Sequence, residues 1–171
     1  MSISMYQSSA PIFIRMLNNL SAILDKTQAH AEAKKFDSAN YLQARLAPDM
    51  LPFSKQVQIA CDAAKGCMAR LAGVEIPKHP DTEQSLAELN TRIATVVDFV
   101  KSFKLEQIDG TEGKEIVLKL GPKQDFILNF TGLTFLQAFS MGNFYFHTTT
   151  AYARLRHQGV DLGKQDFLGR A

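Results

Sequence analysis

Hydrophobic side chains recur every three or four residues in three segments of the first part of the chain. This spacing places them on one face of a helix, and it predicts helices over residues 5–28, 49–72 and 82–104. Residues 29–47 are polar and mixed, and we expect them to form a connector. The predicted buried faces hold Ile12, Phe13, Met16, Leu17, Leu20, Ile23 and Leu24; Phe53, Val57, Ala60, Cys61, Ala64, Met68 and Leu71; and Leu86, Leu89, Ile93, Val96, Val97, Val100 and Phe103.

Capping residues mark the starts of two of these helices. Asp49 can accept hydrogen bonds from free backbone N–H groups and is predicted to cap the second helix, although its carboxylate is also a metal ligand by type. Asp81 and Gln84 are predicted to form a variant capping box for the third helix. Gly73 is expected to end the second helix.

The period of the hydrophobic pattern changes after residue 104. Alternation over 115–130 predicts a β-hairpin, and helical spacing returns over 132–158, which predicts a fourth long helix that ends at Gly159. The tail GVDLGKQDFLGRA is a Gly-rich arm that is expected to fold back onto an apolar surface of this chain or of a partner subunit. The alternating hairpin residues are Ile116, Leu118, Leu120, Phe126, Leu128 and Phe130.

Chain length supports a single core. With 171 residues and 46% hydrophobic content, the chain can bury one sizeable core but is too short for a second full domain. We therefore expect one all-α domain over residues 1–171. It has four long helices, a small hairpin insertion before the last of them and a C-terminal arm. Long connections between some helices argue against a simple up-down-up-down arrangement.

Charge and hydropathy bear on the partners and the location. The formal net charge is +2, from 19 basic and 17 acidic residues spread along the chain, so no nucleic-acid partner is expected. No apolar run approaches the roughly 18 residues that a bilayer span requires, so no membrane partner is expected. The segment MSISMYQSSAP lacks the basic and apolar regions of a signal peptide, and a cytoplasmic location is expected.

Two motifs argue against particular chemistries. Cys61 and Cys67 lie about 240° apart around one helix, so neither a disulfide nor a metal pair is expected, and both are predicted to be buried thiols. The segment GVDLGK superficially resembles a phosphate-binding loop. However, Gln165 follows its lysine in place of Ser or Thr and no strand precedes it, so nucleotide binding there is not expected.

Polar side chains interrupt the apolar face of the fourth helix. Asn143, His147 and Thr150 share one face, which Leu136 and Phe139 continue towards the N-terminus. Neutral imidazole can coordinate a metal through one nitrogen while the other donates a hydrogen bond, so this face is a candidate site. A hydrogen-bonded core histidine that braces neighbouring helices is the other interpretation, and both remain open.

The remaining histidines are not expected to join this face. His157 follows His147 by ten residues, about 280° around the helix, and with Arg154 and Arg156 it suits the negative end of the helix dipole. His30 and His79 lie in polar segments and are expected at the surface.

Four segments carry a family resemblance: RLAPDM at 45–50, RLAG at 70–73, NFYFHTTTAYARLRHQGV at 143–160 and LGKQDFLG at 162–169. Together they resemble an uncharacterised domain-of-unknown-function family within the DinB-like or YfiT-like superfamily of metalloenzymes. The resemblance covers essentially the whole chain. It implies a DinB-like four-helix bundle, often dimeric, and it supplies no substrate.

The resemblance also implies where a metal would bind. In the superfamily, one His of the second helix and two His separated by three residues on the last long helix hold the ion. Here His147 has Ala151 and Asn143 at the two possible partner positions, and the second helix has Asp49 and Gln56 in place of a His. The implied ligand set is Asp49, Asn143 and His147, for a divalent metal such as zinc or nickel.

Two functions are consistent with these features. One is a non-catalytic, dimeric small-molecule-binding or stress-associated protein with a degenerate metal site. The alternative is a divalent-metal-dependent transferase or hydrolase, in which an ion near His147 activates water or a thiol. No GxSxG motif, supported Cys–His pair or carboxylate pair is present, so whether the protein is an enzyme stays open. The resemblance suggests a homodimer, and so do aromatic residues spread over more than one helix face, namely Phe135, Phe139, Phe144 and Tyr145.

Overall fold

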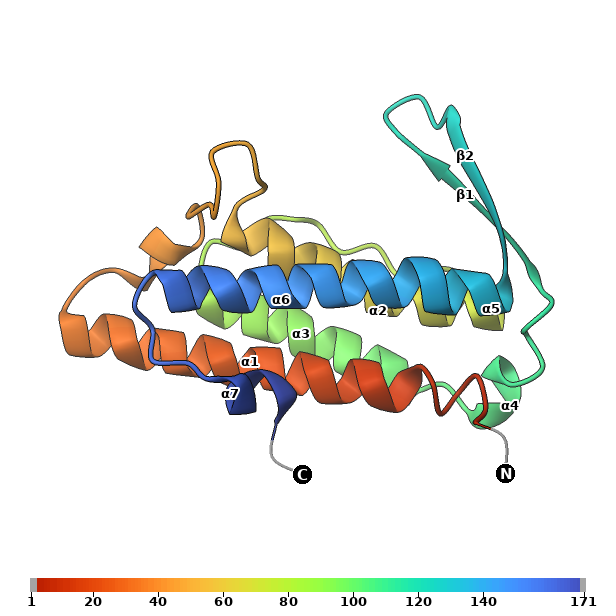
Figure 1. Ribbon diagram of the computed structural model, residues 1–171, viewed down its shortest axis with the longest axis horizontal. Coiled ribbons are helices and arrows are strands. Elements are labelled where there is room, and N and C mark those ends of the chain that lie inside the picture. Colours follow the sequence, from red (N-terminus) through yellow and green to blue (C-terminus); the bar gives the residue numbers. More distant parts are fainter. Residues whose placement is uncertain (1–2, 170–171) are drawn as a thin grey trace.

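Four long helices lie side by side in the computed structural model, which describes residues 3–169 (Figure 1). They are α1 (Ala10–Lys34), α2 (Phe53–Ala72), α3 (Leu86–Lys101) and α6 (Met141–His157). Helix α2 packs against both α6 and α3, and α1 packs against α3. All four predicted helices are therefore present, and the chain is mostly helical.

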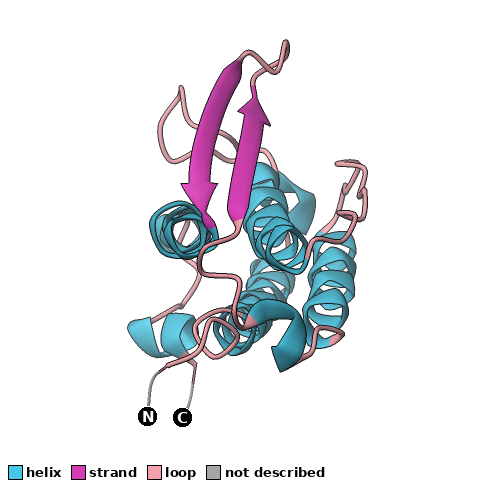
Figure 2. Cartoon of the chain, turned by 90° about the vertical axis from the view of Figure 1, so that its right-hand side faces the viewer, coloured by secondary structure: helices cyan, strands magenta, loops and turns pink. Residues whose placement is uncertain are grey.

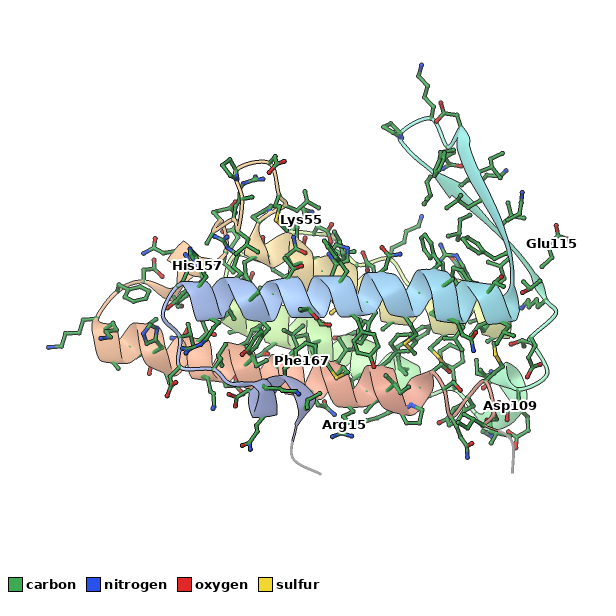
Figure 3. All side chains as sticks on the ribbon, viewed as in Figure 1. Arg15, Lys55, Asp109, Glu115, His157 and Phe167 are labelled. Carbon is green, nitrogen blue, oxygen red and sulfur yellow. The ribbon has the colours of Figure 1, made fainter. Side chains whose placement is uncertain are left out.

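The core lies between these helices, where side chains fill the interior (Figure 3). Each large apolar side chain that is fully buried contributes about 1.5–3 kcal/mol to folding, so the amphipathic faces account for the arrangement of the helices. No helix within residues 3–169 is both long and apolar enough to cross a membrane. The predicted positions that are fully buried include Phe13, Leu17, Leu24, Val57, Ala64, Met68, Leu89, Val96 and Val100.

Several predicted helix boundaries are wrong. Helix α1 begins at Ala10 and continues to Lys34, so residues 29–34 of the expected connector are helical, and the helix stops where Lys35 adopts a left-handed conformation. A short 3-10 helix, η1 (Ser38–Tyr41), follows. Helix α2 begins at Phe53 and not at 49, and its N-cap is Pro52, so the predicted Asp49 cap is wrong. Pro52 has an extended backbone with ψ 166°, and a proline disfavours helical backbone at the residue before it.

The predicted cap of α3 is also wrong. Ser85 is the N-cap, and its Oγ accepts a hydrogen bond from Glu88 N at 3.1 Å, while the Glu88 carboxylate accepts one from Gln84 N at 2.6 Å. Asp81 lies outside the helix, and its carboxylate pairs with Lys55 and Arg92.

The predicted hairpin is confirmed. After the short helix α4 (Leu105–Ile108), strands β1 (Glu115–Leu120) and β2 (Phe126–Thr131) pair antiparallel, with Leu118 opposite Leu128. The hairpin rises from the end of the helices at which the last long helix starts (Figures 1 and 2). Ile116 and Leu118 are buried, so the inner face of β1 covers the helices below it.

The last long helix contains a wide turn that the hydrophobic pattern does not predict. It starts as α5 (Gly132–Thr134), continues through the π-helical segment η2 (Phe135–Ser140) and becomes α6. Single π-helical turns are rare within helices and occur frequently at functional sites. This segment therefore directs attention to the side chains around it.

The C-terminal arm folds back onto the bundle, as predicted, and the surface that it covers belongs to helix α1 of the same chain. Short helix α7 (Lys164–Leu168) packs on α1, where Asn19 Nδ2 donates to Phe167 O at 3.0 Å and Lys26 pairs with Asp166 at 2.7 Å. The Phe167 ring meets Tyr152 edge to face, at a centroid distance of 5.8 Å. Of the two leucines of the arm, Leu162 is buried and Leu168 is exposed.

Candidate functional site

His147 is a buried residue on α6 that faces α2. Its Nδ1 lies 2.7 Å from Oε1 of Gln56, while Nε2 of Gln56 donates to Leu51 O at 3.0 Å. Because the amide nitrogen is used in this way, Oε1 must accept, and Nδ1 of His147 carries the proton. Burial lowers the pKa of His147, so the imidazole is neutral at pH 7 and its lone pair is on Nε2.

No hydrogen bond among the described residues joins His147 to Asp49 or Asn143, its predicted companions. Asp49 is exposed in the segment that precedes α2, and Asn143 is half-buried with its Nδ2 donating to Phe139 O at 2.9 Å. Within residues 3–169, no group of three or more His, Cys, Asp or Glu side chains is placed to hold a metal ion. The donors around His147 thus do not fit a three-ligand metal site, because a neutral amide, Gln56, faces it from α2.

A cavity of about 260 Å³ lies between α2, the π-helical segment and strand β1. His147 does not line it, but Asn143, one of the predicted site residues, does. Its walls are mainly apolar, with a few polar groups. Binding sites for small molecules typically combine these two features. The lining residues are Ile59, Asp62, Ala63, Cys67, Arg70, Leu118, Leu120, Phe135, Phe139, Ser140 and Asn143.

Arg70 is the cation of this cavity. Its Nη1 donates to Gly66 O at 3.1 Å, and its guanidinium carbon lies 5.9 Å from the centre of the Phe135 ring. No carboxylate within residues 3–169 forms an ion pair with it, and burial lowers its pKa. Asp62, the acidic residue of the lining, instead pairs with Lys65 at 2.8 Å and with Arg92 at 3.1 Å. The positive charge of Arg70 is therefore left uncompensated.

Gly66 allows Arg70 to lie along the surface of α2. A Cβ atom at this position would lie 2.5 Å from Arg70 Nη1, which is closer than van der Waals contact permits. Because Nη1 is at the end of a flexible side chain, a larger residue would displace the guanidinium without displacing the helix. The absence of a side chain at Gly66 thus sets the position of the charge.

Cys67 is unsuited to nucleophilic chemistry. Burial raises the pKa of its thiol to about 12, and the opposing hydrogen bond to Ser140 does not offset this. Burial likewise raises the pKa of Cys61 to about 12, and both cysteines are free and buried, as predicted. A protonated thiol is a poor nucleophile, so Cys67 acts as a wall of the cavity.

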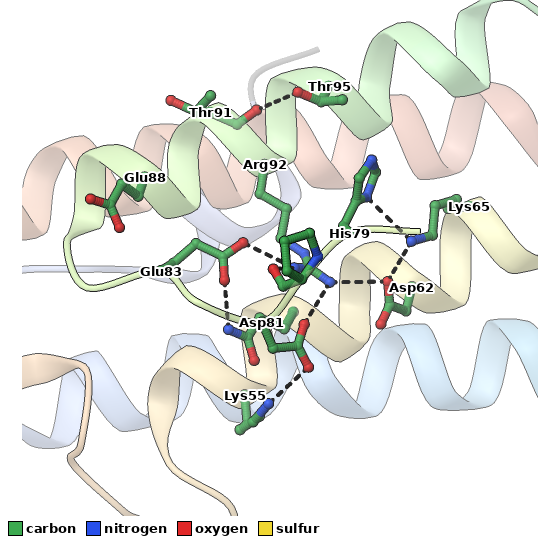
Figure 4. A network of polar contacts seen from close by, with 12 residues as sticks. Lys55, Asp62, Lys65, His79, Asp81, Glu83, Glu88, Thr91, Arg92 and Thr95 are labelled. Atoms are coloured by element: carbon green, nitrogen blue, oxygen red, sulfur yellow. Dashed lines mark hydrogen bonds and ion pairs between the residues drawn. The ribbon is translucent and has the colours of Figure 1, made fainter. Parts of the chain in front are cut away.

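A second hollow of about 330 Å³ shares Asp62 and Arg70 with the cavity, and Gly66 also lines it. Lys65, Lys78 and His79 also line it, so it is rich in basic groups. Burial, followed by the charge of Lys65, lowers the pKa of His79, whose Nδ1 lies 3.2 Å from Lys65 Nζ (Figure 4). His79 is thus half-buried and partnered, contrary to the prediction of a solvated residue.

The other two histidines, His157 and His30, both lie on long helices. His157 is exposed in the last turn of α6, as predicted. His30 lies in α1, half-buried, and its Nδ1 is 2.7 Å from the Tyr41 hydroxyl, so the prediction of a surface position in a connector is wrong.

Comparisons with known proteins agree with this architecture. No curated protein matches the chain. The crystal structure of a DinB family member protein from Shewanella denitrificans is 43% identical, covers 97% of this chain and 92% of that chain, and superposes with a TM-score of 0.86. Residues 5–168 match the family model described as domain of unknown function DUF1993. With its helical fold, its hairpin and this match, the chain belongs to the DUF1993 family and is a DinB-like protein.

Proposed function

We propose that this DinB-like four-helix bundle binds a small molecule with an apolar body and a carboxylate, in the cavity below the hairpin. The observation that carries the proposal is the uncompensated charge of Arg70 at the wall of an apolar cavity. A guanidinium recognises a carboxylate through paired, charge-assisted hydrogen bonds, and such bonds strengthen where water is excluded. Phe135, Phe139 and Leu118 would bury the hydrocarbon part of the ligand.

The geometry favours binding over catalysis. Cys67 is protonated, Asp62 is ion-paired, and Asn143 Nδ2 is bonded to a backbone carbonyl, so none of the three is a free base or nucleophile. At about 260 Å³ the cavity is at the small end of ligand pockets, which suits a compact acid. The alternative, a zinc- or nickel-dependent transferase or hydrolase, would require metal ligands that converge on His147. Because the donors around His147 do not form such a set, we expect protein purified without a His tag to lack stoichiometric metal.

Hexanoate should raise the melting temperature of the protein, whereas hexanol, which has the same chain length and no charge, should not. At a ligand concentration of about 100 times Kd the stabilisation would be about 2.7 kcal/mol. Arg70→Met should abolish the effect, and Gly66→Ala should weaken binding while it keeps the charge. Thermal unfolding followed by circular dichroism, with calorimetric titration, measures both. Equal responses to hexanoate and hexanol, or an unchanged response in Arg70→Met, would contradict the proposal.

We also propose that the protein is a homodimer joined through the outer face of α6. No Asp, Glu, Lys or Arg occurs between Asp125 and Arg154, so this face is uncharged along its length. The aromatic residues that suggested a dimer divide between core and surface: Phe135 and Phe144 are buried, and Tyr145 is exposed. The exposed apolar side chains of the last long helix are Leu133, Tyr145 and Phe146, the last with 56% of its surface accessible. Exposed apolar area of this kind is typical of interfaces.

Phe146→Lys should therefore convert the dimer to a monomer. A lysine on this face would place like charges opposite each other across a two-fold axis, which opposes association. Sedimentation velocity at micromolar concentration measures the change, since the monomer has a mass of 19.0 kDa. Phe126→Lys, at an exposed position of the hairpin, is the control and should leave the dimer intact. A wild-type protein that sediments as a monomer would rule the interface out.

A further inference from the structure

Arg154, in the last turn of α6, is a buried cation without a partner. Only 3% of its surface is accessible, and its Nε and Nη1 have no hydrogen-bond acceptor within residues 3–169. No carboxylate of the described chain forms an ion pair with it either. A buried guanidinium without an acceptor is strongly unfavourable, so these donors are available to a water or to an anion.

A second arginine, Arg45, acts on the charge of Arg154. Arg45 belongs to the 42–52 segment, the loop that joins η1 to α2 at the end of the molecule where α6 finishes (Figure 1). Phe53 N donates to Ala44 O at 2.9 Å, which fixes this loop against the start of α2, and Arg45 Nη1 donates to Met50 O. Burial lowers the pKa of Arg154, and the charge of Arg45 lowers it further. The guanidinium groups of Arg45 and Arg154 are therefore close enough for their charges to repel.

The contacts of α2 and α6 place this pair away from the Arg70 cavity. Gln56, in the first turn of α2, meets His147, and Arg154 lies seven residues further along α6 on the same face. The cavity lies at the other end of that helix, beside Asn143 and the π-helical segment. A ligand of the arginine pair is therefore independent of the proposed carboxylate ligand.

We propose that Arg154 and Arg45 bind a phosphate group, either free inorganic phosphate or the phosphate of a small metabolite. Two guanidinium groups match the charge of a phosphate better than the single charge of a carboxylate. The tetrahedral ion offers several acceptor oxygens, so one can accept from the unpartnered Nε of Arg154 while another meets Arg45. The exposed, carbonyl-anchored Arg45 would close over the ion from the loop.

Removal of the buried charge should change stability in opposite directions with and without the ion. In phosphate-free chloride buffer, Arg154→Met should melt at or above the temperature of the wild type, because an unpaired buried charge is replaced by an apolar side chain of similar length. In millimolar inorganic phosphate at matched ionic strength, the wild type should gain stability and the variant should not. Arg45→Met should weaken phosphate binding at least about tenfold in calorimetric titration.

Arg156→Met is the matched control, since Arg156 is exposed in the same helical turn and should keep the full response to phosphate. Titration with glycerol 3-phosphate distinguishes the two sources of the phosphate group. Tighter binding of glycerol 3-phosphate than of inorganic phosphate would indicate a metabolite site, and tighter binding of inorganic phosphate a site for the free ion. Acetate should not stabilise the wild type. An equal loss of the phosphate response in Arg156→Met, stabilisation by acetate to the same extent, or no response of the wild type would each overturn the proposal. If Arg154→Met does not fold in either buffer, the phosphate titration of Arg45→Met still tests the proposal.

Discussion

Gly132→Ala is expected to destabilise the protein by about 3 kcal/mol or more, at the upper end of what overpacking costs. Gly132 begins the last long helix directly after β2, and a Cβ atom at this position would lie 1.9 Å from the carbonyl oxygen of Thr111. Because that oxygen belongs to the backbone, relief requires movement of the chain between α4 and β1. Leu133 N also donates to Glu112 O at 3.0 Å, so the same movement would strain this hydrogen bond.

Urea unfolding followed by circular dichroism measures the loss, and Gly142→Ala is the control within the same helix. Apart from its own helix backbone and chain neighbours, nothing within residues 3–169 lies within 4 Å of a Cβ at Gly142. Because Gly142 is one helical turn from Phe146, the control is made in the Phe146→Lys background, where alanine should stabilise the protein by about 0.5–1 kcal/mol through its higher helix propensity. Gly132 also precedes the cavity residue Phe135, so its variant should bind hexanoate more weakly. A Gly132→Ala protein as stable as the wild type would show that the junction is not rigid.

The helices could be predicted because burial on one helix face leaves a local pattern. The apolar positions of the pattern between Phe13 and Leu24, and between Leu86 and Val100, are buried in the structure. The ends were harder to predict, because Asp49, Asp81 and Ser85 are all suitable caps by residue type. In the structure Ser85 caps the third helix while the Asp81 carboxylate pairs with Lys55 and Arg92, and such ion pairs between distant residues leave no local pattern in the sequence.

The candidate site was only partly predictable for the same reason. His147 stands out because it interrupts an apolar stripe, and the structure buries it against Gln56, one of the two substitutes expected on the second helix. The Arg70 cavity combines α2, β1 and the π-helical segment, and no sequence spacing connects them. Whether an arginine such as Arg70 or Arg154 has a carboxylate partner is likewise decided only when distant segments meet.

Arg92→Met is expected to destabilise the protein by about 1.5–3 kcal/mol at pH 7, because it removes charge-assisted hydrogen bonds and leaves the Glu83 carboxylate, whose side chain is only 11% exposed, without its cation. The Arg92 side chain is 3% exposed and joins three acidic residues of α2 and of the linker before α3 (Figure 4). Its Nη2 lies 3.1 Å from Asp62 and 3.0 Å from Asp81, and its Nη1 lies 2.9 Å from Glu83. Methionine would fill the space but leave these carboxylates without their shared cation.

The pH dependence of this loss identifies the carboxylates as its cause. Burial alone would raise the pKa of Asp81 and of Glu83. The hydrogen bond from Lys55 and the charge of Arg92 outweigh burial for Asp81, and the hydrogen bond from Arg92 does so for Glu83, so both pKa values lie below their ordinary 3.8 and 4.5. The stability that they contribute is present above those ordinary values and disappears as the pH falls through the lower folded-state values. Urea unfolding should therefore show the largest difference between wild type and Arg92→Met near neutral pH, and a shrinking difference below the ordinary pKa values.

Lys55→Met is the matched control for this prediction, because Lys55 shares the Asp81 carboxylate with Arg92 but differs from it in burial. The side chains of Lys55 and Asp81 are each 38% exposed, and an ion pair this accessible to solvent contributes less than about 1 kcal/mol. Water can solvate the Asp81 carboxylate when Lys55 is removed, whereas the buried Arg92 guanidinium also holds Asp62 and Glu83. Equal losses in the two variants, or an Arg92→Met loss that does not change with pH, would show that packing of the Arg92 side chain, and not its charge, connects α3 to α2.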